Sequence, residues 1–247
     1  MVFSYVSIRQ DIKTNLRYCD VHRSNYRIMP LTILSHQAPG LALKARFPKK
    51  FDGTALCFGT FIPDLNFIFD FFYPINFYGF THSLVGQILW TTPLAIVATL
   101  IFSRYLGPLF AKIASQKSKF YEPLRYFGID QWKYLKHKKF SRNFWIISAY
   151  SALIGGIFHI LLDWFSHSNV YILYPWIFGP NFDFLFFSII NYGIITLGPI
   201  TFEANLTIFT LLWWLESIIT AIISLSYLRY IKKNDLIRIW HEELYRK

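Results

Sequence analysis

The sequence predicts an all-α fold: a polytopic bundle of about four transmembrane helices with one further re-entrant or interfacial segment. Three observations lead to this prediction. Of the 247 residues, 54% are hydrophobic and only 16% are charged, against about 25% charged in an average soluble domain. Long apolar segments recur along the chain, and the basic residues are confined to blocks between them. Such a composition excludes a disordered chain and a soluble coiled coil.

The basic residues fall into three blocks. Nine lie in residues 1–50, ten in residues 104–142 and six from Arg229 onward, whereas residues 51–103 and 143–228 contain no Lys or Arg. This alternation is the positive-inside pattern of a multi-span protein. The net charge of +11 therefore indicates membrane lipids, and not nucleic acid, as the partner. We expect an integral protein of a bacterial inner (plasma) membrane with cytoplasmic termini.

The basic blocks also define the domain organisation. Residues 1–28 contain no apolar run long enough for a signal peptide, so we interpret them as a disordered basic extension. An arm that binds anionic headgroups is the alternative. An integral membrane helical domain is expected over residues 29–231, with a basic cytoplasmic loop at 104–142. Residues 232–247 would form a basic C-terminal tail.

Three segments are clearly apolar and long enough to cross a hydrocarbon core about 30 Å thick, which takes about 20 residues. They are Leu84–Phe102, Phe144–Phe165 and Leu206–Leu228. Ala55–Tyr73 is a fourth candidate that carries two aspartates, and Phe184–Ile200 is a fifth, short and interrupted by Gly and Pro. Counting the fourth but not the fifth places all basic blocks on one side. We therefore expect four spans, with the fifth segment re-entrant or interfacial.

The clearest chemical pattern lies near the end of the second apolar segment. His159 and Asp163 are four residues apart, so they share a helix face, and His167 continues it by another turn. With no Lys or Arg nearby in the sequence, a buried Asp163 carboxylate needs a proton, water or a cation. Imidazole and carboxylate bind divalent zinc, manganese or iron. A simple His–Asp hydrogen bond is the alternative.

Further polar residues interrupt apolar surroundings elsewhere in the chain. They are Ser35-His36, Pro63-Asp64-Leu65-Asn66, Thr81-His82-Ser83 and the single residue Glu216. A lone histidine near a helix start is more often interfacial than a ligand, so each is weak by itself. Glu216 either faces a metal site or is a protonated buried acid. Gly155 and Gly156 allow another helix to approach closely.

These motifs, in this order, resemble those of membrane-bound metal-dependent hydrolases, the inner-membrane group related to the LexA-regulated hydrolase family. The shared motifs are Ser-His at 35–36, Pro-Asp at 63–64, Thr-His-Ser at 81–83 and Gly-x-x-His-x-x-x-Asp from Gly156 to Asp163. The start at Met29 and the aromatic run after Pro63-Asp64 are closer still to the uncharacterised membrane family called domain of unknown function 4184. The resemblance covers about residues 29–167.

The resemblance implies a metal site and hydrolysis of a lipid-linked or membrane-proximal ester. The implied ligands are His36, Asp64, His82, His159 and Asp163. Asn66, His167 or Asp183 would supply the remaining catalytic role, with Asn66 or His167 orienting water. Asn66 stands where the hydrolase group has a second Asp, and Phe77-Tyr78 where it has His-Arg, which fits one metal better than two. The competing interpretation is a non-enzymatic membrane protein with a structural or cation-binding His/Asp site.

Overall fold

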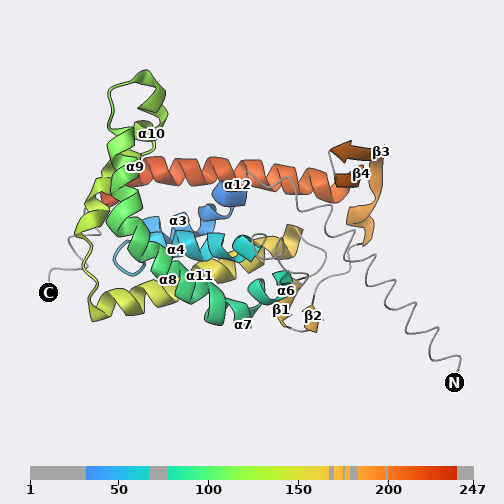
Figure 1. Ribbon diagram of the computed structural model, residues 1–247, viewed down its shortest axis with the longest axis horizontal. Coiled ribbons are helices and arrows are strands. Elements are labelled where there is room, and N and C mark those ends of the chain that lie inside the picture. Colours follow the sequence, from blue (N-terminus) through green and yellow to red (C-terminus); the bar gives the residue numbers. More distant parts are fainter. Residues whose placement is uncertain are drawn as a thin grey trace, which may run out of the picture.

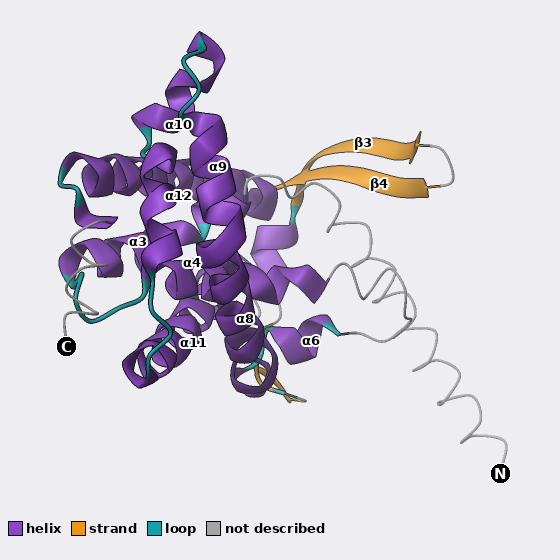
Figure 2. Ribbon diagram, turned by 60° about the vertical axis from the view of Figure 1, so that its left-hand side comes forward, coloured by secondary structure: helices purple, strands orange, loops and turns teal. Residues whose placement is uncertain are grey.

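The computed structural model is mostly helical, with two short β-hairpins beside the helices (Figures 1 and 2). The structure describes residues 32–66, 77–166, 170–174, 176–178, 183–197 and 200–237. The predicted N-terminal extension, residues 1–28, and most of the predicted C-terminal tail lie outside this part.

The first three helices of the described chain pack in sequence order. The short helix α2 (Thr32–Ser35) leads into α3 (Gln37–Arg46), which packs against α4 (Gly53–Phe61). Asp52 caps α4, because its Oδ1 accepts hydrogen bonds from two backbone N–H groups of the first turn. The chain then tightens into a 3-10 turn, Ile62–Leu65, whose second residue is Pro63. Proline lacks the N–H that a continuing helix would need.

Three helices in the described part are long and apolar enough to cross a membrane. They are Leu84–Ala114, α11 (Arg142–Ser166) and α12 (Ile208–Lys233). They match the three clear predicted spans: the first extends twelve residues further, α11 agrees within two residues at each end, and α12 begins two residues later and ends five residues later than predicted. The fourth candidate, Ala55–Tyr73, is not among them, because α4 ends at Phe61 and residues 67–73 lie outside the described part.

The first long helix is irregular at two places. It consists of α7 (Leu84–Gly86), α8 (Thr92–Ile101) and α9 (Gly107–Ala114), joined by π-helical turns at Gln87–Thr91 and Phe102–Leu106. Each π turn lies just before a helix with a proline in its first turn. A proline cannot donate to the carbonyl four residues back, and the wider turn accommodates the missing bond.

Glycines set the distance between α4 and α11. A Cβ atom at Gly59 would lie 2.2 Å from the backbone oxygen of Ala152, and one at Gly155 would lie 2.4 Å from that of Leu56. Only hydrogen fits at such separations, so the two backbones touch. The predicted close approach at Gly155 is confirmed, and it fixes the 3-10 turn after α4 against the C-terminal half of α11.

The described parts of the three basic blocks lie at one end of the molecule. In the loop after α9, α10 (Glu122–Tyr126) and a 3-10 helix, Ile129–His137, pack against α9. Lys138 Nζ lies 2.7 Å from Asp52 Oδ2, which joins this loop to the start of α4. Arg229 of α12 donates to the Tyr126 carbonyl at 3.0 Å. Figure 1 shows α9, α10 and the end of α12 grouped on the left.

Two hairpins occupy the chain between α11 and α12. The first pairs β1 (Val170–Leu173) with β2 (Trp176–Phe178), and the second pairs β3 (Ser188–Leu197) with β4 (Ile200–Thr207). The second projects from the helices (Figure 2). The segment expected to be re-entrant or interfacial thus contains a strand, in keeping with its β-branched and aromatic residues.

Candidate metal centre

The five predicted ligands come together although they lie on four separate elements. His36 precedes α3, Asp64 lies in the 3-10 turn after α4, and His82 ends the short helix α6 (Tyr78–Thr81). His159 and Asp163 share one face of α11. Two overlapping groups could each hold a metal ion: His36, Asp64 and His159, and His82, His159 and Asp163.

Asp163 lies at the centre of the cluster and contacts all three histidines. Its Oδ2 is 3.1 Å from His159 Nε2 and 3.3 Å from His82 Nε2, and its Oδ1 is 3.3 Å from His36 Nε2. Asp64 approaches from the other side. Its Oδ1 is 3.4 Å from His159 Nε2 and 3.6 Å from His82 Nε2. All three imidazoles therefore point the same nitrogen at the carboxylates.

The opposite ring nitrogens are held by the protein. His159 Nδ1 lies 2.8 Å from the Thr60 carbonyl oxygen, and His82 Nδ1 lies 3.1 Å from that of Tyr78. A carbonyl only accepts, so in the neutral ring these contacts place the proton on Nδ1 and leave a lone pair on Nε2. His36 Nδ1 lies 3.3 Å from Ser35 Oγ. Such outer contacts orient the histidine ligands of metal sites.

The neighbouring residues fix the position of His82. Ser83 Oγ accepts from the Gly86 N–H at 3.0 Å and so caps the start of α7. The Tyr78 ring stacks on the His82 ring with centroids 3.9 Å apart. His82 is therefore clamped where the short helix α6 meets the first long helix.

The cluster is buried except at one ligand. His82, His159 and Asp163 are at most 3% exposed, and His36 is 7% exposed. The Asp64 side chain is 26% exposed. Access to the cluster is therefore on the side of Asp64.

The spacing of the nitrogen atoms fits a shared cation. His82 Nε2 and His159 Nε2 are 3.2 Å apart. When both rings are neutral, each Nε2 carries a lone pair, and the two lone pairs repel unless a proton or a metal cation lies between them. Two nitrogen ligands of one tetrahedral zinc, each at 2.0–2.1 Å, are about 3.3 Å apart. The donor set of imidazole and carboxylate also matches manganese and iron.

The other predicted residues differ in how much the structure says of them. Asn66 is buried directly after the 3-10 turn that carries Asp64. His167 lies outside the described residues, and the side chain of Asp183 is not described. Glu216 of α12 is half-buried, and it interacts electrostatically with His36 and Asp163. The interaction is consistent with a side chain facing the cluster, and a protonated buried acid stays the alternative prediction.

Sequence reasoning missed Gln87. Its side chain is fully buried, and Nε2 donates to the Thr81 carbonyl at 2.7 Å, next to His82. A Cβ at Gly156 would lie 1.8 Å from Gln87 Oε1, so Gly156 leaves the space that this amide fills. The sequence did contain a signal: Gln87 is a lone amide near the start of the apolar run that follows Thr81-His82-Ser83.

Comparison with known proteins gives one result. No curated protein and no solved structure matches this chain. A match to the family described as "Domain of unknown function (DUF4184)" covers residues 29–233. Its first residue is the Met29 at which the membrane domain was expected to begin. The description assigns no activity, so the resemblance to metal-dependent hydrolases stays a prediction. Because the match spans most of the sequence, the chain belongs to the DUF4184 family.

Proposed function

We propose that the cluster binds one divalent metal ion, zinc, manganese or iron, and that the protein is a membrane-embedded hydrolase of a lipid-linked or membrane-proximal ester. One observation carries the metal site. The Nε2 atoms of His82 and His159 lie 3.2 Å apart beside two carboxylates, while both Nδ1 atoms lie at backbone carbonyls. With both rings neutral, a cation between the two Nε2 atoms removes the repulsion of their lone pairs.

The residues then have separate roles. His36, His82, His159 and Asp163 hold the ion from the buried side, and Asp64 holds it from the accessible side. Asn66, two residues after Asp64, orients water at the accessible face, and His167 is the other candidate for this task. A bound ion would supply a Lewis acid and lower the pKa of a coordinated water toward neutrality.

A structural or cation-binding site in a non-enzymatic membrane protein is the second candidate. The nearly complete burial of His82, His159 and Asp163 favours it, because structural zinc sites are closed by protein ligands whereas catalytic ones keep an open position. The partial exposure of Asp64 favours catalysis.

Metal analysis tests the site. Purified protein is stripped with a chelator, reloaded with zinc, manganese or iron, and measured by mass spectrometry for metal per chain. We expect one ion in the wild type and none in Asp163→Asn or His159→Ala. His137→Ala, which removes an exposed histidine of the basic loop, should bind normally. A wild type that stays empty with every metal, or an Asp163→Asn variant with full occupancy, would contradict the proposal.

Activity separates the two candidates. We expect the metal-loaded protein to hydrolyse members of a panel of phospholipid and lipid-linked esters, and chelation to stop it. Asn66→Ala should keep the metal and reduce turnover, because the side chain orients water and is not a ligand. A loaded wild type with no metal-dependent hydrolysis of any panel member would favour the structural site.

We also propose that the protein lies in the bacterial inner membrane with its basic end in the cytoplasm. The contacts that join the three basic blocks support one common side. His82 lies just before the first long helix and Asp163 near the end of α11, in both cases far from the basic end of the helix. The cluster would therefore face the outer leaflet. Reporter fusions near Lys117 and after Lys247 should then report the cytoplasm.

The number of spans can be tested in the same way. The segment 32–46 is about 22 Å long at 1.5 Å per residue, short of a hydrocarbon core of about 30 Å. We therefore propose four spans, the fourth being the predicted segment Ala55–Tyr73, with α2 and α3 entering the membrane without crossing it. A fusion after Met29 should report the cytoplasm, and one near Asn76 the opposite side. The reverse result at Met29 would exclude the four-span topology.

A further inference from the structure

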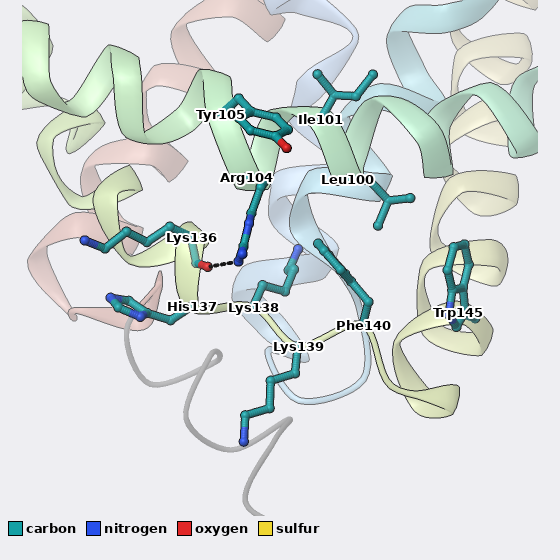
Figure 3. Close-up of a pocket in the computed structure, with 10 residues that line it drawn as sticks. All are labelled: Leu100, Ile101, Arg104, Tyr105, Lys136, His137, Lys138, Lys139, Phe140 and Trp145. Carbon is teal, nitrogen blue, oxygen red and sulfur yellow. Dashed lines mark hydrogen bonds between the residues drawn. The ribbon is translucent and has the colours of Figure 1, made fainter.

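An open cavity of about 750 Å³ lies at the basic end, between the first long helix and the start of α11. Figure 3 shows Arg104 reaching from the helix toward Lys136, near the end of the 3-10 helix Ile129–His137. Arg104 Nη1 donates to the Lys136 carbonyl at 3.3 Å. This contact closes one side of the cavity and keeps the guanidinium in its wall.

The polar side of the cavity is basic. Lys136 and Lys139 accompany Arg104, and no Asp or Glu is among the described residues that line the cavity. In the described part of the chain, none of these three residues forms an ion pair. Lys138, between the two lysines, is buried and paired with Asp52. The nearby Lys136 and Lys139 are exposed. The site therefore has an excess of positive charge.

The other side of the cavity is apolar. Leu100 and Ile101 precede Arg104 by about one helical turn, and Trp145 faces them from the first turns of α11. Ile101 and Trp145 are nearly half exposed. They lie at the ends of the two base-free apolar stretches, where a tryptophan typically marks the boundary between headgroups and hydrocarbon.

We propose that this cavity binds one anionic phospholipid. The phosphodiester lies against Arg104 and Lys139, since guanidinium and ammonium groups bind phosphate oxygens by charge-assisted hydrogen bonds. The glycerol and acyl chains follow Ile101 and Trp145 along the two helices. The apolar side is what favours a lipid over free phosphate.

The site is separate from the metal cluster. Trp145 and His159 lie about 21 Å apart along α11 at 1.5 Å per residue. Lipid binding and metal binding are therefore independent proposals, and a variant of one site should leave the other intact.

Lipid binding can be measured on the full chain in a neutral detergent. Native mass spectrometry during titration with phosphatidylglycerol should show one tightly bound lipid per chain, and phosphatidylcholine should bind at least about 10-fold more weakly. Arg104→Gln with Lys139→Gln should weaken phosphatidylglycerol about 30-fold, because two basic contacts to the headgroup are lost. Lys112→Gln with Lys117→Gln removes the same charge from exposed positions outside the cavity and should change binding less than about 2-fold.

Two further results decide between sources of the phosphate. Trp145→Ala should weaken phosphatidylglycerol and leave competition by inorganic phosphate unchanged. Inorganic phosphate that displaces the lipid at comparable concentration would show an anion site without lipid preference. Equal loss in both double variants would show a diffuse charge effect. Either outcome, or no stoichiometric lipid at all, would overturn the proposal.

Discussion

The two ends of this molecule compensate buried carboxylates in different ways. At the basic end, Asp52 is buried beside Lys138, with Ser148 Oγ 3.3 Å from its second oxygen. At the other end, Asp163 is equally buried, yet every ion pair it forms among the described residues is with histidine. Asp52 has a permanent cation supplied by the chain, whereas the imidazoles around Asp163 are neutral unless protonated.

The difference shows which end needs a partner from outside. Burial lowers the pKa of Lys44, the second lysine near Asp52, to about 7, an effect that Asp52 opposes and Lys138 increases. Lys44 is then only partly charged at neutral pH, and Lys138 is the main partner of Asp52. This end is complete within the chain. At the Asp64–Asp163 end, the partners seen among the described residues are histidines, which compensate the carboxylates when they are protonated or when they share a metal ion with them.

The largest expected effect is at the complete end. Asp52→Asn keeps a good N-cap for α4 but leaves Lys138 buried without its anion, so we expect a loss of about 3–5 kcal/mol in the free energy of unfolding. The loss should be the same with metal or chelator. Asp130→Asn is the control, because its pair with Lys232 is 3.8 Å long and partly exposed and should contribute less than about 1 kcal/mol.

The next largest effect is the metal dependence of Tm, which tests the end of the molecule that contains Asp64 and Asp163. Metal at about 100 times its dissociation constant stabilises a folded protein by about 2.7 kcal/mol, which corresponds to roughly 5–10 °C in Tm for a chain of this size. Chelation should lower the Tm of the wild type and of Asp52→Asn by that amount. Asp163→Asn should show no difference between the two conditions. A metal response in Asp163→Asn would mean that the ion binds elsewhere.

A smaller effect links packing to the metal site. Gly155→Ala places a Cβ 2.4 Å from the Leu56 backbone oxygen, so α4 must move and carry Asp64 away from His159. We expect a loss of about 1–3 kcal/mol together with weaker metal binding. Gly40→Ala makes an ordinary 3.5 Å contact with Leu56 and should be nearly neutral. Metal titrations measure the affinity of both variants. Equal affinities in Gly155→Ala and Gly40→Ala would argue against a link between this packing and the metal site.

The smallest effect concerns pH. Burial raises the pKa of Asp52, but the charges of Lys138 and Lys44 and the hydrogen bonds from Lys138 and the Ala55 N–H outweigh it and hold the pKa below its ordinary 3.8. A carboxyl group whose pKa is lowered on folding stabilises above its unfolded pKa, and the contribution is lost as pH falls through the folded pKa. The stability difference between wild type and Asp52→Asn should therefore shrink as the pH falls from about 5 to below about 4. Denaturant titrations at these pH values would measure it.

The sequence predicted the parts of the fold that depend on local patterns. Hydropathy located Leu84–Ala114, α11 and α12, because crossing a membrane requires a continuous apolar run. The five histidines and aspartates were found because acids without nearby bases are rare in apolar stretches. Whether they bind metal stays a prediction.

The remaining features depend on contacts that no local pattern encodes. Asp52 and Lys138 are separated by 86 positions, and both lie among other polar residues. The Thr60 and Tyr78 groups that orient the histidines are backbone carbonyls, which every residue has. The strand β3 arises by pairing with β4, and a run rich in isoleucine and aromatic residues fits a membrane segment equally well.

The π-helical turn Gln87–Thr91 makes the site sensitive to chain length. Such a turn contains one more residue than an α-helical turn of similar rise. Removing one residue there would restore a regular helix and leave the hydropathy profile almost unchanged. It would also rotate everything before the turn by about 100° relative to α8, which would swing His82 away from His159. A relative that lacks one residue in this turn would still align as a membrane helix, but its cluster would have to be rebuilt with a different third histidine.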